Sequence, residues 1–190
     1  MENTSTPVRL TYADLCRLPD DGLRHELIDG EHYVTAAPTY RHQRVAMNVA
    51  GLLFMFLREH RLGHVYMAPL DVLFSEVDVV EPDVLYVSEE RLRSQQEDRY
   101  LEVTPELVVE VLSPSTKHVD RGAKRRLYER QGVTEYWLID PLLETVQVFR
   151  RERDRFEVAA DLVRQRDAAP ASLSTPLLPG LQLSLDEVFD

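Results

Sequence analysis

One short segment, residues 107–112, constrains the fold of this chain more than any other. Its sequence, Leu-Val-Val-Glu-Val-Leu, is the strongest β-strand signal present and predicts a strand in the centre of a sheet. Side chains alternate between the two faces of a strand, so Glu110 shares its face with Val108 and Leu112. A carboxylate among apolar side chains is costly unless it has a partner. The segment therefore predicts a central strand that carries a polar site.

The other elements are predicted from hydrophobic periodicity and from residues that favour turns or helix ends. Asp29-Gly30 has the composition of a two-residue hairpin turn that needs positive φ. The order of elements fits an α/β or α+β fold, with a mixed sheet flanked by helices. We expect helices over 11–18, 39–61, 88–96 and 120–131, strands over 65–74, 79–87 and 136–140, hairpins over 25–34 and 145–159, and a short amphipathic segment over 181–189.

The length of the chain indicates a single domain. Its 190 residues can bury one substantial core, and 44% hydrophobic and 29% charged residues are ordinary proportions for a globular protein. We expect one domain over residues 1–190, with 1–24 as an N-terminal brace and 160–190 as a C-terminal tail that packs on it.

Two features limit where the protein acts and how it could hold a metal. The first residues lack a signal peptide pattern, and the longest apolar run, 49–57, is shorter than the roughly 20 residues that cross a bilayer. We therefore expect a cytoplasmic protein without membrane contact. Cys16 is the only cysteine, which excludes an intrachain disulfide and a four-cysteine zinc site. Any metal must be held mainly by oxygen or histidine.

Asp83 supplies a second carboxylate in a setting similar to that of Glu110. It follows Pro82 and opens an apolar stretch, 84–87, that would form a strand beside that of Glu110. Magnesium prefers carboxylates on rigid neighbouring elements, with water positions left open. We predict that Asp83 and Glu110 are metal ligands. Pairing of Glu110 with an arginine or with backbone amides is the structural alternative.

Lys124 is predicted to point inward. On a helical projection of residues 120–131 it lies on the face of Asp120 and Tyr128, whereas Arg121 and Arg125 lie outside that face. An inward lysine could pair with Asp120, four residues earlier, or stabilise charge that develops on a phosphate. The outward arginines would supply a local basic face, which nucleic acid requires and a chain of net charge -11 lacks overall.

Two further residues are candidates whose role the spacing does not decide. His42 begins the long predicted helix, on the face of Val45 and Val49, and is either a structural histidine or a ligand, proton shuttle or substrate contact. Glu26 lies on the first strand of the predicted hairpin. It is solvated there unless the hairpin packs beside the site.

These segments, taken together, resemble the Uma2 family of bacterial proteins, usually described as restriction endonucleases and placed in the PD-(D/E)XK nuclease superfamily. The resemblance covers roughly residues 11–189. It is carried by His-Glu-Leu-Ile-Asp-Gly at 25–30, Arg-His-Gln at 41–43, Pro-Asp-Val at 82–84 and Val-Glu-Val-Leu-Ser-Pro-Ser-Thr at 109–116, and it continues through Asp120, Lys124, Tyr128, Gly-Val at 132–133 and Tyr-Trp-Leu-Ile-Asp-Pro at 136–141.

The resemblance implies a restriction-endonuclease-like core and metal-assisted hydrolysis of phosphodiester bonds in nucleic acid, with DNA as the first expectation. Asp83 and Glu110 match the metal-binding acids of the superfamily, Glu26 is an additional acid, and the metal is Mg²⁺, with Mn²⁺ as a substitute. The usual lysine is absent, because Leu112 stands two positions after Glu110. Lys124 would supply the ammonium from the next helix. The auxiliary or substrate-contacting candidates are His42, Asp120, Tyr128, Arg121 and Arg125.

Two other functions fit the same sequence. Because the lysine position is altered and the net charge is acidic, the chain could be a catalytically weak or inactive nuclease-fold protein that acts as a nucleic-acid-binding or regulatory module. It could also be an interaction protein, such as a homodimer. The module would bind nucleic acid without a divalent metal, whereas the interaction protein would bind neither.

Overall fold

The predicted central strand, β7 (Leu107–Val111), lies inside a six-stranded mixed sheet in a computed structural model that describes residues 9–96, 98–165 and 169–190. It pairs in parallel with β8 and antiparallel with β6, and all its residues are buried. The prediction of a central strand in a mixed sheet is confirmed. From edge to edge the sheet consists of β10 (Arg155–Val163), β9 (Thr145–Glu152), β8 (Glu135–Asp140), β7, β6 (Val84–Ser88) and β3 (Gly63–Met67).

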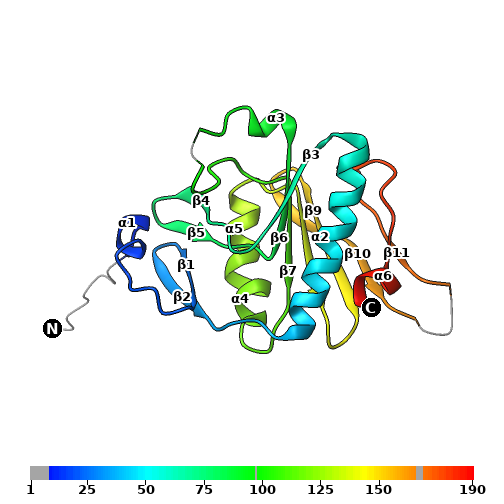
Figure 1. The fold of residues 1–190 in the computed structure, drawn as a ribbon, viewed down its shortest axis with the longest axis horizontal. Helices are drawn as coiled ribbons and strands as arrows, with labels where there is room; N and C mark the ends of the chain where they lie inside the picture. The colour runs from blue at the N-terminus through cyan, green and yellow to red at the C-terminus, as the bar shows by residue number, and fades with distance from the viewer. Residues whose placement is uncertain (1–8, 97, 166–168) are drawn as a thin grey trace.

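Helices lie on both sides of this sheet (Figure 1), and an apolar cluster lies against each of its faces. On one face, Val109 and Val111 pack in a cluster with α2 (Tyr40–His60) and α6 (Leu185–Phe189). On the other face, Val108 and Leu112 pack in a cluster with α5 (Arg125–Arg130). Glu110 shares that second face because side chains alternate along the strand. Its carboxylate is therefore directed toward the helix that carries the predicted lysine.

A four-stranded antiparallel sheet contributes to the second apolar cluster. Its hairpin turn has positive φ at both central residues, 55° at Asp29 and 76° at Gly30, as the sequence predicts. This turn joins β1 to β2 in a regular antiparallel register. The order of the strands is β2 (Glu31–Thr35), β1 (Arg24–Ile28), β5 (Asp78–Val80) and β4 (Val72–Ser75).

The long helix α2 has nearly the predicted bounds, whereas two short helices do not. Thr39 caps α2 by accepting a hydrogen bond from the N–H of His42, and Arg61 ends the helix in a left-handed conformation. By contrast, α1 (Tyr12–Leu15) and α3 (Glu89–Leu92) are shorter than the helices predicted over 11–18 and 88–96. Neither contains a buried residue. A short helix that buries no residue fully has little to offset the cost of extending it.

Two predicted strands, 65–74 and 79–87, are wrong in extent. Each is interrupted by a proline, Pro69 in the first and Pro82 in the second, because proline has no N–H to donate to a ladder. The strands before and after each break belong to different sheets. The second break places Asp83 where the chain passes from the four-stranded sheet to the six-stranded sheet.

The helix predicted over 120–131 begins earlier and is not uniform. It consists of α4 (Lys117–Val119), a π-helical turn η1 (Asp120–Lys124) and α5, and Gly132 follows with positive φ. π-Helical turns are rare and are frequent at functional sites. Asp120 and Lys124, the two ends of η1, are both buried.

The described residues near the two ends of the chain contact the rest of the fold. Near the N-terminus, the N–H of Tyr12 donates to the carbonyl of Glu76, which follows β4. The tail forms β11 (Ser172–Leu173), β12 (Leu183–Ser184) and α6, whose Leu185 and Val188 are buried in the cluster with α2. Residues 1–8 and 166–168 lie outside the described residues. Among the described helices, none has the length and apolar character to span a membrane.

The substitution Gly63→Ala is expected to weaken the edge of the large sheet. Gly63 has a φ of 154°, and a Cβ there would collide with the carbonyl oxygen of Val87 on β6. Because relief would require a shift between the paired strands β3 and β6, the free energy of unfolding should fall by about 1–3 kcal/mol. Urea unfolding followed by circular dichroism measures the change. Gly51→Ala in α2, where nothing lies within 4 Å of the added Cβ, is the control and should not lose stability.

Candidate active site

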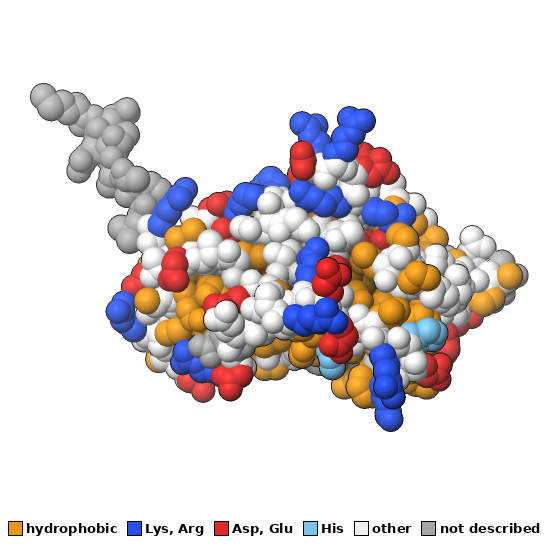
Figure 2. Space-filling view, turned by 90° about the horizontal axis from the view of Figure 1, so that it is seen from above, with side chains coloured by type: hydrophobic (Ala, Val, Ile, Leu, Met, Phe, Trp, Pro, Cys, Tyr) orange, Lys and Arg blue, Asp and Glu red, His pale blue; other side chains and the backbone are white. Residues whose placement is uncertain are grey.

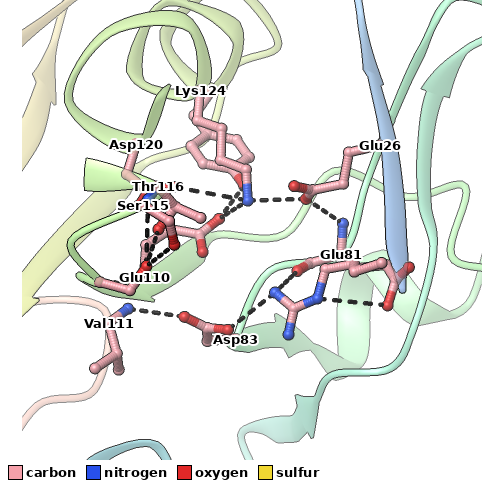
Figure 3. A network of polar contacts seen from close by, with 12 residues as sticks. Glu26, Glu81, Asp83, Glu110, Val111, Ser115, Thr116, Asp120 and Lys124 are labelled. Atoms are coloured by element: carbon pink, nitrogen blue, oxygen red, sulfur yellow. Dashed lines mark hydrogen bonds and ion pairs between the residues drawn. The ribbon is translucent and has the colours of Figure 1, made fainter. Parts of the chain in front are cut away.

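A cavity of about 170 Å³ opens where the start of β6, the end of β7 and strand β1 come together. The loop 35–39 before α2 and the loop 113–116 after β7 form the rest of its rim. Figure 3 shows carboxylates from several elements around a single ammonium, that of Lys124. The carboxylates that line the cavity are Glu26, Asp83, Glu110 and Asp120. The residues predicted as metal-binding acids and as the inward lysine are therefore neighbours in one cavity.

Asp83 immediately precedes β6, as predicted. The first residue of that strand, Val84, pairs with Val109 of β7 in an antiparallel register. Continuing this register by one residue places Asp83 opposite Glu110. The two acids thus come from neighbouring strands at one end of the sheet, although the sequence separates them.

Three donors hold the carboxylate of Asp83. Its Oδ2 accepts from Nε2 of His42 at 3.0 Å and from the N–H of Val111 at 2.9 Å, and its Oδ1 accepts from Nη1 of Arg24 at 3.1 Å. Burial alone would raise the pKa of Asp83, but the hydrogen bond and charge of His42, with the charge of Arg24, outweigh burial and lower that pKa to about 2. Asp83 is ionised at neutral pH.

Glu110 lies in a more apolar setting, at 2% exposure. Its Oε1 accepts from Nζ of Lys124 at 3.0 Å and from the hydroxyl of Tyr128 at 2.6 Å. Burial raises the pKa of Glu110 to about 8, although the charge of Lys124 opposes this. The neighbouring charge of Asp83 also raises it. The ionised form of Glu110 would be favoured by a further positive charge in the cavity.

The ammonium of Lys124 lies among three carboxylates. Its Nζ is 2.8 Å from Oε1 of Glu26, 3.0 Å from Oε1 of Glu110 and 3.8 Å from Oδ1 of Asp120. The i, i+4 pair with Asp120 is thus the longest of the three contacts. Burial would lower the pKa of Lys124, but the charges of Glu110, Glu26 and Asp120 raise it above its ordinary value, so the side chain stays charged. Leu112, at the usual lysine position, packs in the apolar cluster.

Glu26 belongs to the cluster because the hairpin packs beside it. It is 2% exposed, and besides contacting Lys124 its Oε1 accepts from the N–H of Glu81 at 2.8 Å. Of the two settings considered for Glu26, the buried one is correct.

Asp120 is held through its backbone, because its carbonyl oxygen accepts a hydrogen bond from the hydroxyl of Tyr136 at 3.1 Å. Burial raises the pKa of Asp120 to about 6.

His42 contacts Asp83. It is 7% exposed, and because a carboxylate can only accept, its Nε2 carries the proton in this contact. Its Nδ1 is buried and has no hydrogen-bond partner among the described residues. This geometry indicates a role exerted through Asp83, which was not among the roles considered from the sequence.

Two predicted substrate contacts lie away from the cavity, and one site residue was missed. Arg125 stacks over the ring of Phe149, with its Cζ 4.3 Å from the ring centroid, and neither it nor the exposed Arg121 lines the cavity. Arg24, which was not predicted from the sequence, does line the cavity. The available signal was that Arg24 lies two residues before Glu26 on the same strand and hence on the same face.

The acidic groups of the cluster outnumber its permanent cations. Five carboxylates, those of Glu26, Glu81, Asp83, Glu110 and Asp120, surround two permanent cations, Arg24 and Lys124. Burial also raises the pKa of Glu81, to about 7. Acidic and basic side chains are interspersed on the face shown in Figure 2, and no extended basic patch covers that face. A cation in the cavity would favour the ionised forms of the acids whose pKa burial raises.

The residues present fit a magnesium ion that keeps several water molecules. In the described part of the chain, no three His, Cys, Asp or Glu side chains are arranged to hold a metal directly. Magnesium, however, is commonly bound through one or two carboxylates, with water completing its octahedral shell. Asp83 and Glu110 supply two carboxylates from rigid neighbouring strands, and both line the cavity.

Comparisons with known proteins agree on family and fold. The model of the Uma2 family, described as "Putative restriction endonuclease", matches residues 11–186. An uncharacterized protein of Synechocystis, slr1290, is 29% identical over 136 residues, covering 69% of this chain and 68% of its own. A crystal structure from Anabaena variabilis, titled as a putative nuclease of DUF820, superposes with a TM-score of 0.77 at 21% identity, covering 96% of this chain and 98% of that one. That likeness supports the restriction-endonuclease-like fold.

Proposed function

The chain belongs to the Uma2 family, and from this membership and the geometry of its site we propose that it is a metal-dependent nuclease that hydrolyses phosphodiester bonds, with DNA as the first substrate to test. One observation carries the proposal. The ammonium of Lys124 reaches Oε1 of Glu110, next to Asp83, although Leu112 occupies the usual lysine position. Two acids and one ammonium thus meet in a cavity, an arrangement that suits metal-assisted phosphodiester hydrolysis.

The residues of the cavity have separable roles in this proposal. Asp83 and Glu110 would hold Mg²⁺ or Mn²⁺, which lowers the pKa of a bound water and offsets the charge of the phosphate. Lys124 donates to the phosphate as negative charge develops on it. Glu26 keeps Lys124 aimed at Glu110, because its Oε1 contacts the same Nζ. His42 orients Asp83 through Oδ2.

The shape around the cavity suits an extended chain of phosphates. Two neighbouring depressions share walls with the cavity, one through Arg24 and the loop 35–38, the other through Glu26 and the loop 115–116. The three hollows therefore adjoin one another beside the cluster. A strand of nucleic acid that lies along them would pass its backbone over Lys124.

One observation favours the alternative of a nuclease fold that binds nucleic acid without turnover. Asp83 already has three donors, so a metal ion must share its carboxylate with Arg24 and His42. In this alternative, binding of an oligonucleotide persists in a chelator and tolerates the loss of the Asp83 charge.

The substitution Asp83→Asn tests the proposal. Removing the charge should weaken magnesium or manganese binding at least about tenfold in calorimetry. Cleavage of a supercoiled plasmid and of a labelled oligonucleotide should fall at least about 100-fold. Asp78→Asn is the matched control, because Asp78 is also buried and paired with an arginine, Arg130, but lies outside the cavity.

Three outcomes are distinguishable. Loss of metal binding and cleavage in Asp83→Asn, with both retained in Asp78→Asn, supports the nuclease. A wild type that neither binds metal nor cleaves at millimolar metal overturns it. Oligonucleotide binding that is unchanged by chelator and by Asp83→Asn, without cleavage, establishes the binding module instead.

A further inference from the structure

Arg24 stands at the mouth of the site with its charge only partly buried. It begins β1, and its side chain is 18% exposed, compared with 4% for Lys124. Its Nη1 donates to Oδ1 of Asp83 and to the carbonyl oxygen of Glu81, both at 3.1 Å. A guanidinium has five N–H donors. These two hydrogen bonds use Nη1, and Nε lies 3.9 Å from Oε2 of Glu81. Arg24 therefore keeps donors for a ligand while it contacts the site.

The position of Arg24 conflicts with a metal ion on Asp83. Oδ2 of Asp83 is already used by His42 and Val111, so Oδ1 is the oxygen with room for another partner. Arg24 donates to that same oxygen. Two cations on one carboxylate oxygen repel each other, and inside a protein the repulsion is stronger than in water. A metal ion that binds Asp83 would weaken the hold of Asp83 on Arg24.

The guanidinium of Arg24 borders a second depression next to the cavity. It lines both the cavity and the adjoining depression formed by residues 22–24, 35–38, 68–69 and 81. Among the described residues that line these two hollows, the permanent cations are Arg24 and Lys124, and only Arg24 lines both. A phosphate that lies between the two hollows would have Lys124 on one side and Arg24 on the other.

We propose that Arg24 exchanges partners, holding Asp83 while the site lacks metal and gripping a non-bridging oxygen pair of a substrate phosphate once metal occupies Asp83. The inference rests on the proposed nuclease function and adds the residue that couples metal binding to phosphate binding. The planar fork of arginine suits this role, because it matches two phosphate oxygens at once, whereas lysine contacts as a point charge. The carbonyl of Glu81 does not depend on the metal and keeps the guanidinium at the mouth during the exchange.

Two substitutions separate the charge of Arg24 from its fork. Arg24→Gln removes the charge that competes for Asp83, so magnesium should bind the free protein about fivefold more tightly in calorimetry. The same variant should raise the KM for oligonucleotide cleavage about tenfold or more, because a charged contact to phosphate is lost. Arg24→Lys keeps the charge and loses the fork, so its metal affinity should stay near that of the wild type while its KM rises.

The control is Arg130→Gln, which breaks a similar pair with a buried acid, Asp78, outside the cavity. It should change neither metal affinity nor KM. Thermal unfolding of every variant shows whether it is folded at the assay temperature. Opposite changes in metal affinity and substrate affinity cannot result from a merely loosened structure, which would weaken both.

The outcomes distinguish this inference from the function on which it rests. If the wild type binds metal and cleaves, but Arg24→Gln and Arg24→Lys both keep its metal affinity and KM, the partner exchange is overturned and the nuclease stands. If Arg24→Gln weakens both metal and substrate, Arg24 only supports the shape of the site, and the exchange is likewise overturned. If the wild type neither binds metal nor cleaves, both proposals fail.

Discussion

Replacement of Lys124 by methionine is expected to reduce cleavage at least about 100-fold and to lower the free energy of unfolding by about 3–5 kcal/mol in the absence of metal. Methionine has a similar length but no charge. In the wild type, the ammonium of Lys124 contacts the carboxylates of Glu26, Glu110 and Asp120. Methionine would leave these three carboxylates buried around an apolar side chain. Removing one partner from a buried ionic cluster is costly because the others lose their compensation.

The chain contains a second lysine that serves as control. Lys117, in α4, is exposed, so Lys117→Met should leave stability within about 0.5 kcal/mol of the wild type and leave cleavage unchanged. Urea unfolding and initial cleavage rates are measured for both variants. Cleavage by Lys124→Met within a few-fold of the wild type, under conditions where it is folded, would mean that the displaced lysine has no part in the reaction.

The substitution Glu110→Gln should separate metal binding from stability. Glutamine keeps the shape of the side chain and an oxygen for the hydroxyl of Tyr128, and it removes a charge that burial disfavours. We therefore expect the metal-free variant to stay within about 2 kcal/mol of the wild type. Its response to metal should disappear. When the metal concentration is about 100 times its dissociation constant, the free energy of unfolding of the wild type rises by about 2.7 kcal/mol, which raises Tm by roughly 5–10 °C. The same metal concentration should leave the free energy of unfolding of Glu110→Gln almost unchanged.

The control is Glu135→Gln, which should lower stability but leave the response to metal unchanged. Glu135 is a buried acid on β8, the parallel neighbour of β7, and its two oxygens accept from Nε1 of Trp137 at 2.7 Å and Nε of Arg150 at 2.8 Å. Its role is structural, so the variant should lose stability but keep the metal-dependent rise in Tm and keep cleavage. A metal-dependent rise in Glu110→Gln equal to that of the wild type would remove Glu110 from the metal site.

The periodicity of a single strand or helix was enough to predict which way a site residue on that element points. Strand alternation in 107–112 placed Glu110 on the face opposite Val109 and Val111, and the structure has it there. The helical projection placed Lys124 inward, and this holds in spite of the π-helical turn. Both predictions depend only on the repeat of a single element, which neighbours in the chain determine.

The extents of several elements could not be predicted in this way. The segments 65–74 and 79–87 have the composition of continuous strands, yet each divides between two sheets. The choice of sheet depends on the strands available as partners, which are distant in the chain. Short helices such as α3 depend on packing for their length. The composition of a segment shows neither its partner strands nor the packing around it.

The amino-acid pattern alone therefore predicts a central strand with a buried acid, a hairpin turn and a helix that turns a lysine inward. The remaining residues of the site come together only in the folded chain: Glu26 and Arg24 come from β1, and His42 comes from α2. These residues meet Lys124 and Asp83 because β1 and α2 pack at the same end of the large sheet. The physical reason is that alternation and helical repeat are set over a few residues, whereas the partner of a buried charge is whatever polar group the packing of distant elements brings within reach.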